Sequence, residues 1–366
     1  MPKLAVQLVM YNEERYIPYL FYSLKKQTFQ DWELLYLDNG STDRTMEYVK
    51  KELETLKQSY RIFPLPDNKG FSAGHSILYG ESTAPYVLLL NADMYLMPNV
   101  FEEIVKFLDT YKEVASVGPR LMRWDFEKVK LFSELEKDAV PSIVAREGFT
   151  NLIDALGIRL FRNRRAVEWL TQHEWRKDSE SNEVRQIYNE KTLEVFGVSG
   201  ALVCYRRDII ERVLLPVKQI FDPTYHSYKE DVDLAYRFRN AGYTSYVILQ
   251  YVAWHDRTGA GAKEMTDKAA LKNKKRHSFF VKTKSYKNHI LTLYKNEYWQ
   301  NFLLDFPFIF WYELKKFVYF LVFDTKVLIV AWRDLLQSFS YARSARRVIL
   351  DSRKLYWKGI RRWIIK

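Results

Sequence analysis

Cysteine is nearly absent from the 366-residue chain, which contains Cys204 alone. A single thiol excludes an internal disulfide framework and argues against a zinc site built from cysteines. Such scarcity is typical of proteins that stay in a reducing compartment.

Long uninterrupted apolar runs are missing as well. The first apolar run, residues 4–10, follows Met-Pro-Lys directly and is too short for a signal-peptide core with a cleavage site. Residues 301–339 are rich in aromatic side chains, but charges interrupt them before any stretch reaches the ~18 residues of a spanning helix. We therefore expect a cytoplasmic protein, peripheral on the inner face of the cell membrane.

Excess positive charge is missing from the first two-thirds of the chain. Residues 1–262 contain 34 Lys+Arg and 37 Asp+Glu, whereas residues 263–366 contain 23 and 8. The apolar content of 48% is enough to fill a core. This asymmetry predicts a near-neutral catalytic body, residues 1–262, followed by a basic segment that seeks an anionic surface.

Short apolar runs alternate with amphipathic stretches in the first hundred residues. Strands are predicted at residues 4–10, 32–37, 60–65 and 86–90, and helices at residues 13–26, 43–57 and 71–79. Near-continuous apolar strands separated by helices indicate an α/β fold, with a mostly parallel sheet covered by helices on both faces.

Polar residues follow each predicted strand. In parallel sheets, ligands bind in the crevice beyond the carboxyl ends of the strands. The four sets are Tyr11-Asn12-Glu13-Glu14, Asp38-Asn39-Gly40-Ser41-Thr42-Asp43, the run from Asp67 to His75, and Asn91-Ala92-Asp93. Each set alone fits ordinary turn chemistry, and Ser41 or Thr42 could cap the next helix. Four sets on one sheet edge instead predict a binding site.

These stretches resemble the family-2 inverting glycosyltransferases, which have the GT-A (Rossmann-like) fold. The resemblance is carried by VQLVMYNEERYI, DWELLYLDNGSTDRT, NKGFSAGH, LLLNADMYLMP, FGVSGALVCYRRDII and FDPTYHSYKEDVDLAYRFRNAGY followed by WHDRTGAG. They occur in the family's order and cover roughly residues 3–262. The chain is also similar to the branch with rhamnosyl- and related bacterial cell-surface sugar transferases.

The resemblance implies a nucleotide-sugar donor (a UDP-, dTDP- or GDP-sugar) bound by the first half of the body, about residues 1–122. Asp38 would read the base or ribose, with Tyr11 and Glu13 lining the same pocket. The other implied donor contacts are Asn12, Asn68, Gly70, Gly74, His75, Asn91, Ala92 and Gly200.

The resemblance also implies a divalent cation, Mg²⁺ or Mn²⁺. Asp93 occupies the place of the family's Asp-X-Asp motif, but Asn91 stands where a first aspartate is often found. With one carboxylate, we expect weak metal binding assisted by the donor diphosphate. His255 matches a histidine that reaches the metal or diphosphate in some relatives, although a structural histidine after a strand would look the same.

An acidic run in the acceptor-side half, about residues 123–262, resembles the family's catalytic motif. Inverting transfer needs a base that takes the proton of the acceptor hydroxyl. Asp231 is the predicted base and Glu230 positions the acceptor or the base, whereas Asp233 caps the helix or pairs with Arg237. Acidic residues also favour helix N-termini for electrostatic reasons alone.

Two features of the acceptor-side half, a run of small residues and a run of arginines, each allow two interpretations. The small residues 197–201 either let the backbone approach the donor sugar or allow tight packing. Arg162, Arg164 and Arg165 either clamp an acceptor phosphate or form a solvated face.

The last twenty residues show an amphipathic pattern. Ile349, Tyr356, Ile360 and Trp363 recur at helical spacing, with basic residues on the opposite face. This predicts a helix on an anionic membrane, with packing on the body as the alternative. The acceptor is expected to be a glycan or lipid-linked, and membrane contact would suit the lipid-linked one.

Three other functions fit parts of the sequence. Nucleic-acid binding would suit a basic tail, but the acidic crevice and the sorted faces of the tail argue against it. A nucleotidyltransferase would have a Gly-rich basic loop where Tyr11-Asn12-Glu13 stands. Asn91 and His75 leave open a catalytically degenerate relative.

Overall fold

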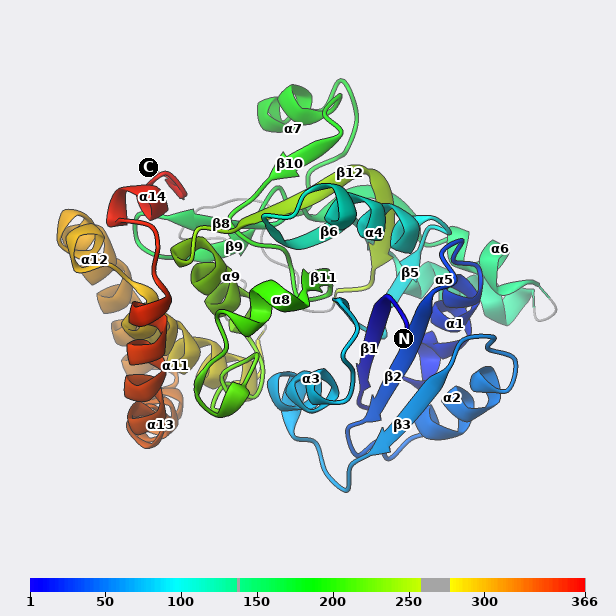
Figure 1. Cartoon of the computed structure of the whole chain (residues 1–366), viewed down its shortest axis with the longest axis horizontal. Coiled ribbons are helices and arrows are strands. Elements are labelled where there is room, and N and C mark those ends of the chain that lie inside the picture. Colours follow the sequence, from blue (N-terminus) through cyan, green and yellow to red (C-terminus); the bar gives the residue numbers. More distant parts are fainter. Residues whose placement is uncertain (137–138, 258–276, 366) are drawn as a thin grey trace.

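The computed structural model describes residues 1–136, 139–257 and 277–365 (Figure 1). One mixed sheet of ten strands forms its centre, with the order β10-β12-β6-β11-β4-β1-β2-β3, while β5 pairs with β12 and β7 with β6. The strands are β1 Leu4–Met10, β2 Trp32–Asp38, β3 Tyr60–Pro64, β4 Tyr86–Leu90, β5 Met94–Leu96, β6 Val114–Trp124, β7 Phe149–Ala155, β10 Thr192–Glu194, β11 Leu202–Arg206 and β12 Thr244–His255. A second sheet contains β8 Ile158–Phe161, β9 Ala166–Glu168 and β13 Ile364–Ile365.

The four strands predicted in the first hundred residues are confirmed. β1 lies between β2 and β4, β3 follows β2, and all these pairs are parallel. The register sets Met10 opposite Asp38, so the loops after β1 and β2 leave the same edge side by side.

The second half of the sheet differs from the predicted parallel pattern. β11 inserts antiparallel between β4 and β6, and β5, β7 and β10 are antiparallel to their neighbours as well. The α/β fold is confirmed, but the sheet is mixed because β5, β7, β10 and β11 run opposite to the strands with which they pair.

Helices cover both faces of the large sheet. On one face, α1 Ile17–Lys25, α2 Thr45–Leu53 and α4 Val100–Thr110 pack on β1, β2 and β4; on the other lie α3 Gly70–Gly80, α8 Arg207–Glu211 and α9 Glu230–Asn240. Shorter elements are η1 Glu14–Tyr16, α5 Phe126–Leu135, α6 Pro141–Arg146, α7 Asn182–Ile187 and η2 Pro216–Lys218.

The C-terminal region is helical, as predicted. It contains α11 Phe279–Asn296, α12 Trp299–Phe323, α13 Thr325–Ser352 and α14 Trp357–Arg361. In Figure 1 these helices stand beside α9 at one end of the molecule. The predicted boundary at residues 262/263 lies outside the described residues. No helix in the described ranges is long and apolar enough to cross a membrane.

Buried ion pairs join this region to the body. Lys295 Nζ lies 2.6 Å from Asp222 Oδ2 and 2.9 Å from Asp233 Oδ1. Arg164, fully buried, pairs with Glu297 and with Asp305, whose oxygen lies 2.9 Å away. Charges so enclosed hold two segments in one relative position, because separating them would leave an unpaired ion in the interior.

The prediction that the last twenty residues form one membrane-bound helix was wrong, and the structure agrees with the alternative, packing on the body. They form no continuous amphipathic helix, because α13 ends at Ser352 and the backbone N–H groups of Lys354 and Leu355 donate to the carbonyl of Asn240. Ile360 is buried in a cluster with residues of β8 and α9, and β13 pairs with β8. Ile349, Ile360 and Trp363 therefore pack on the protein, whereas Tyr356 is exposed.

Both interpretations of the arginine run fail for Arg162 and Arg164. Arg162 Nε lies 2.9 Å from Asp305 Oδ1, and Arg164 is enclosed by the same carboxylate and by Glu297. These two side chains hold α12 in place and are not a phosphate clamp or a solvated face. Arg165 alone lines a cavity.

Candidate active site

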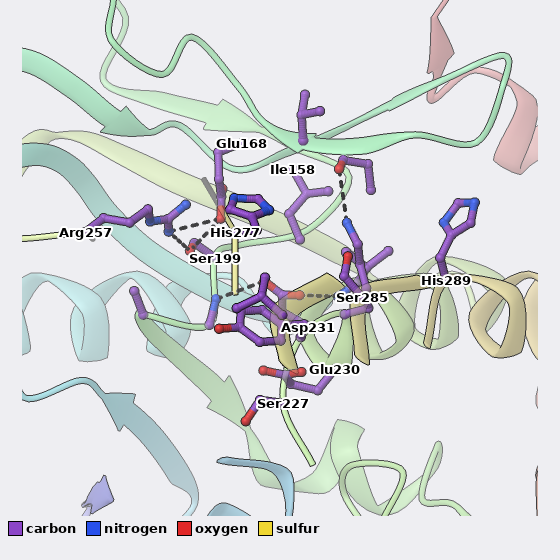
Figure 2. A pocket seen from close by; sticks show the side chains of 18 of the residues that line it. Ile158, Glu168, Ser199, Ser227, Glu230, Asp231, Arg257, His277, Ser285 and His289 are labelled. Atoms are coloured by element: carbon purple, nitrogen blue, oxygen red, sulfur yellow. Dashed lines mark hydrogen bonds and ion pairs between the residues drawn. The ribbon is translucent and has the colours of Figure 1, made fainter. Parts of the chain in front are cut away.

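A cavity of about 800 Å³ opens where the sheet meets α9 and the C-terminal helices (Figure 2). Strand-end residues Asn91, Asp93 and His255 line one end, Gly200 and Asp231 line the middle, and α11 and α12 wall the other end. The cavity thus brings together six of the predicted site residues: Asn91, Asp93, Gly200, Glu230, Asp231 and His255.

The two predicted metal ligands face each other. His255 Nε2 lies 3.2 Å from Asp93 Oδ2, and the other ring nitrogen, Nδ1, lies 2.8 Å from Asp154 Oδ2. Burial opposes protonation of the ring, but Asp93 and Asp154 raise the pKa of His255 to about 9. The two carboxylates fix the orientation of the imidazole.

This pair fits a divalent cation in part. Two neighbouring ligands of one metal, each about 2.1 Å from it, lie about 3 Å apart, which matches the pair. No group of three or more His, Cys, Asp or Glu side chains able to hold a metal occurs among the described residues. Asp93 and His255 would therefore hold a cation only together with oxygens of a bound diphosphate and water.

Sequence reasoning missed a buried network beside this pair. Arg257 Nε lies 3.3 Å from Asp154 Oδ2, and Arg257 Nη2 lies 3.2 Å from Glu168 Oε1 and donates to Ser199 Oγ at 3.0 Å. Burial raises the pKa of Glu168, and Arg257 only partly opposes this. Figure 2 shows Arg257, Glu168 and Ser199 together on one side of Asp231. Arg257 stands in the WHDRTGAG stretch, the one signal that could have pointed to it.

Asp231 and Glu230 begin α9 in different surroundings. Asp231 Oδ2 accepts a hydrogen bond from the backbone N–H of Gly200 at 3.3 Å. Burial, and then the charge of Asp231, raise the pKa of Glu230 to about 8. Within the described residues, the buried Glu230 Oε2 has no hydrogen-bond partner. Asp233 pairs with Arg237 at 3.2 Å, as predicted.

The residues predicted to read the base or ribose lie outside the cavity lining, at the adjoining ends of β1 and β2. Tyr11 is exposed, and Asp38 is buried, with Oδ2 accepting from Ser41 N–H at 3.2 Å. Burial, more than the neighbouring carboxylates Asp93 and Asp43, raises the pKa of Glu13 to about 8.

Asn12 links these two loops. Its backbone N–H donates to Ser41 Oγ at 3.1 Å, and its side-chain oxygen accepts from Thr42 N–H at 2.8 Å. Neither Ser41 nor Thr42 caps α2, contrary to expectation, because the helix begins at Thr45, whose N–H donates to Asp43.

Four other predicted donor contacts, Asn68, Gly70, Gly74 and His75, contact the protein's own backbone and side chains. Asn68 accepts from the N–H of Gly70, where φ is +86° and a Cβ would collide with the His226 ring. A Cβ on Gly74 would lie 2.8 Å from a methyl group of Val9, so this glycine lets α3 approach β1. His75 is buried beside Gln7, and burial lowers its pKa to about 3.

Asn91 and Ala92 directly precede Asp93, one of the two predicted metal ligands. Asn91 N–H donates to the carbonyl of Ala201 at 2.9 Å, which ties the end of β4 to the Gly200 loop, and Ala92 is buried. Gly74 and His75 do not line the cavity, whereas Asn91 does.

The sequence profile described as "Glycosyl transferase family 2" matches residues 6–214, more than half of the chain. The chain belongs to this family. It is 26% identical over 160 residues to a teichoic acid poly(glycerol phosphate) polymerase of Staphylococcus epidermidis, covering 42% of this chain and 22% of that one. It is 28% identical over 114 residues to a poly(ribitol-phosphate) β-N-acetylglucosaminyltransferase, TarS, of Staphylococcus aureus, covering 30% and 20%.

A solved structure shares the fold of this family-2 glycosyltransferase. The crystal structure of GalNAc-T7 with UDP, GalNAc and Mn²⁺ matches with a TM-score of 0.53 and 11% identity, over 81% of this chain and 48% of that one. Family membership makes the chain a glycosyltransferase. It spans less than a quarter of the length of the two staphylococcal relatives.

Proposed function

We propose that this family-2 glycosyltransferase moves a sugar from a nucleotide-sugar donor to a hydroxyl group of a glycan or lipid-linked acceptor, with inversion. The observation that supports this most is the single cavity lined by Asp93, His255, Gly200 and Asp231. It offers one end for the diphosphate, a carboxylate in the middle and a walled space beyond it for the acceptor.

Asp231 is the proposed base. Its carboxylate takes the proton of the acceptor hydroxyl while that oxygen attacks the anomeric carbon, and the bond from this carbon to the diphosphate oxygen breaks. Glu230, with a pKa near 8, is mostly protonated at neutral pH, so it can donate a hydrogen bond to the acceptor without competing for its proton.

Asp93 and His255 are the proposed protein ligands of Mg²⁺ or Mn²⁺. A divalent cation there would neutralise the charge that develops on the departing diphosphate. Asp154 acts as a positioning residue, because it fixes which nitrogen of His255 faces Asp93. The guanidinium of Arg257 adds positive charge at the same end of the cavity.

The loops after β1 and β2 are the proposed nucleoside site. Tyr11 offers an exposed aromatic ring, and Asp38 offers a carboxylate at the adjoining strand end. Asn12 holds the two loops together and so acts on the nucleoside indirectly. The proposed donor site as a whole also includes Glu13, Asn68, Gly70, Asn91, Ala92 and Gly200.

We further propose that the protein lies on an anionic membrane, on its cytoplasmic face, through α12 and α13 instead of the last twenty residues. The outer side of α12 exposes thirteen large apolar side chains, whereas Asp305, Ile309, Lys316 and Phe320 face inward. The exposed set is Trp299, Phe302, Leu303, Leu304, Phe306, Phe308, Phe310, Trp311, Phe317, Val318, Leu321, Val322 and Phe323. A patch of this size marks an interaction surface.

Asp231→Asn tests the assignment of the base. Because the amide cannot accept the proton, transfer should fall about 10²–10⁴-fold. A thermal-shift screen with UDP-, dTDP- and GDP-sugars, each with and without Mn²⁺, first identifies the donor, and the donor-induced rise in melting temperature should persist in the variant.

The control for this test is Asp178→Asn, which changes an exposed carboxylate outside the cavity lining and should leave transfer unchanged. Near wild-type transfer by Asp231→Asn would exclude Asp231 as the base. If none of the donors raised the melting temperature of the wild-type protein, the proposed donor site itself would be wrong.

A further inference from the structure

The end of the cavity beyond Asp231 differs in charge from the end near Asp93. Its walls are α11, α12 and the residues just before β9 and α9, and they supply four cations: Arg165, Lys229, Lys282 and Lys316. The four carboxylates of the lining, Asp93, Glu168, Glu230 and Asp231, come from the sheet edge, the end of β9 and the start of α9. Arg165, directly before β9, lies at the basic end of the cavity, and Glu168, the last residue of β9, lies at the acidic end.

Two of these four cations already have carboxylate partners. Lys316 Nζ lies 2.9 Å from both oxygens of Glu313, and Lys282 Nζ lies 3.1 Å from Asp324 Oδ2. Glu313 also lies 2.9 Å from His289 Nε2. These partners leave Lys316 and Lys282 largely neutralised.

The other two cations have no such partner. Lys229 Nζ donates to the carbonyl of Ala166 at 3.2 Å, and neither Lys229 nor Arg165 forms an ion pair with any residue that the structure describes. Both side chains are half-buried at the cavity wall. Burial lowers the pKa of Lys229, and Arg165 adds to this effect while Asp231 opposes it.

Partly desolvated cations that face one cavity favour an anionic ligand there, because the ligand would restore the lost solvation and relieve their repulsion. The ligand is not the donor diphosphate, which belongs with Asp93 and His255 at the opposite end. Lys229 stands two residues before Asp231, so an anion bound to it would lie close to the hydroxyl that reacts.

We propose, on the basis of the transferase function above, that Lys229 and Arg165 bind a phosphate group carried by the acceptor near its reacting hydroxyl. Arg165 can hold two phosphate oxygens at once, and Lys229 supplies a point charge. Tyr228, Tyr286 and Tyr312 line the same end and give flat surfaces for the sugar or polyol between phosphate and hydroxyl. Acceptors with a phosphate at this position are selected over neutral glycans.

The test is calorimetric titration of the full chain with sn-glycerol 3-phosphate and, separately, with glycerol. EDTA is present, so that no divalent cation draws the phosphate to Asp93. The wild-type protein should bind the phosphate saturably and glycerol not at all. Arg165→Gln and Lys229→Gln should each weaken binding of the phosphate about tenfold or more, the effect expected for one charge-assisted hydrogen bond.

Arg212→Gln is the matched control, since it removes the same charge from an exposed position outside the cavity lining and should leave binding unchanged. The donor-induced thermal shift is measured in every variant. A normal shift shows that the variant is folded and that its donor site works, so failure of this inference is distinct from failure of the proposed function.

Two further ligands identify the source of the phosphate. A glycerophosphodiester represents a polyol-phosphate chain, and farnesyl diphosphate represents a lipid-linked acceptor. Binding of either that is weakened by Arg165→Gln supports the site and names the source. Absence of saturable binding for all three phosphates, or equal loss in Arg212→Gln, would overturn the proposal.

Discussion

Glu230 and Asp231 are neighbours in the chain, yet their surroundings give the two carboxyl groups different chemistry. Asp231 accepts a hydrogen bond from a backbone N–H in the middle of the cavity. Glu230 is buried, and its Oε2 lacks a partner among the described residues. One carboxylate is therefore suited to take a proton and the other to hold one.

The raised pKa of Glu230 has a consequence for stability. Its pKa is about 8 in the folded protein against 4.5 in the unfolded chain, so between these values only the folded state keeps the proton. The stability that this proton contributes is complete below pH 4.5 and is lost as the pH rises through 8. Glu230→Gln keeps a neutral side chain at every pH, so between about pH 5 and 8 its melting temperature should fall less than that of the wild type.

Melting curves of both proteins over that range test this, with Glu54→Gln, a change at an exposed glutamate on the end of α2, as the control. Parallel pH profiles for the wild type and Glu230→Gln would show that Glu230 is ionised in the folded state at neutral pH.

The sequence predicts where Asp93 and Asp231 lie in the fold, while their roles stay predictions. Asp93 and Asp231 stand at a strand end and a helix start, positions that a strand and helix pattern locates by itself. Asp154 and Arg257 were missed because their role depends on contacts between β7 and the end of β12, which are distant in sequence. His75 was misleading, because a polar residue in a Gly-rich turn looks the same whether it faces a ligand or the core.

Among the elements, α12 carries one buried carboxylate that meets three arginines. Asp305 lies within 2.9 Å of nitrogen atoms of Arg162, Arg164 and Arg361. Burial opposes ionisation, but hydrogen bonds from these arginines, Arg361 foremost, lower the pKa of Asp305 to about 2. The C-terminal segment and α12 therefore share one anchor.

Asp305→Ala should destabilise the protein strongly, because among the described residues the buried Arg164 would keep Glu297 as its one counter-ion. Loss of one partner from a buried pair costs about 3–5 kcal/mol, which denaturant unfolding can measure. Asp351→Ala, at an exposed position near the end of α13, is the control. Similar unfolding midpoints for the two variants would contradict the assigned anchor.

For the C-terminal elements, the sequence correctly predicted helices, but it did not predict which surface their apolar sides contact. Ile360 and Trp363 have the spacing of an amphipathic surface helix, and their apolar character is real. Ile360 is nevertheless buried on the body, and Trp363 stacks 4.0 Å from the Arg239 guanidinium. Periodicity reports that one side of a segment is apolar, but it contains no information on whether protein or lipid covers that side.

Across the part of the molecule that the structure describes, exposed large apolar side chains gather on the outer side of α12, and exposed cations lie on the neighbouring α13. Lys326, Arg343 and Arg347 are exposed there. Apolar and cationic groups side by side suit an anionic bilayer better than a second copy of the same basic surface, which would repel.

The full chain should therefore co-sediment with vesicles that contain phosphatidylglycerol, and less with pure phosphatidylcholine or at high salt. Phe306→Ser with Phe310→Ser should reduce binding at least about tenfold, because each exposed ring contributes of order 1 kcal/mol or more when it enters the interface. These rings are 45% and 52% exposed.

Leu131→Ser with Leu135→Ser, which changes two exposed apolar side chains on α5, is the matched control and should bind vesicles normally. Equal binding by both double variants would contradict the assigned surface. So would a wild-type protein that ignores vesicles and forms dimers that Phe306→Ser with Phe310→Ser abolishes.

The family profile ends at residue 214, while α9, α11 and α12 complete the cavity after it. α12 has two sides with separate tasks: Tyr312 and Lys316 face the cavity, and Phe306 and Phe310 face outward. In evolution, this segment can diverge as a unit while the strand-end residues that serve the donor stay constant. Substitutions in this one stretch of chain could then change both the acceptor and the partner that the outer surface of α12 binds.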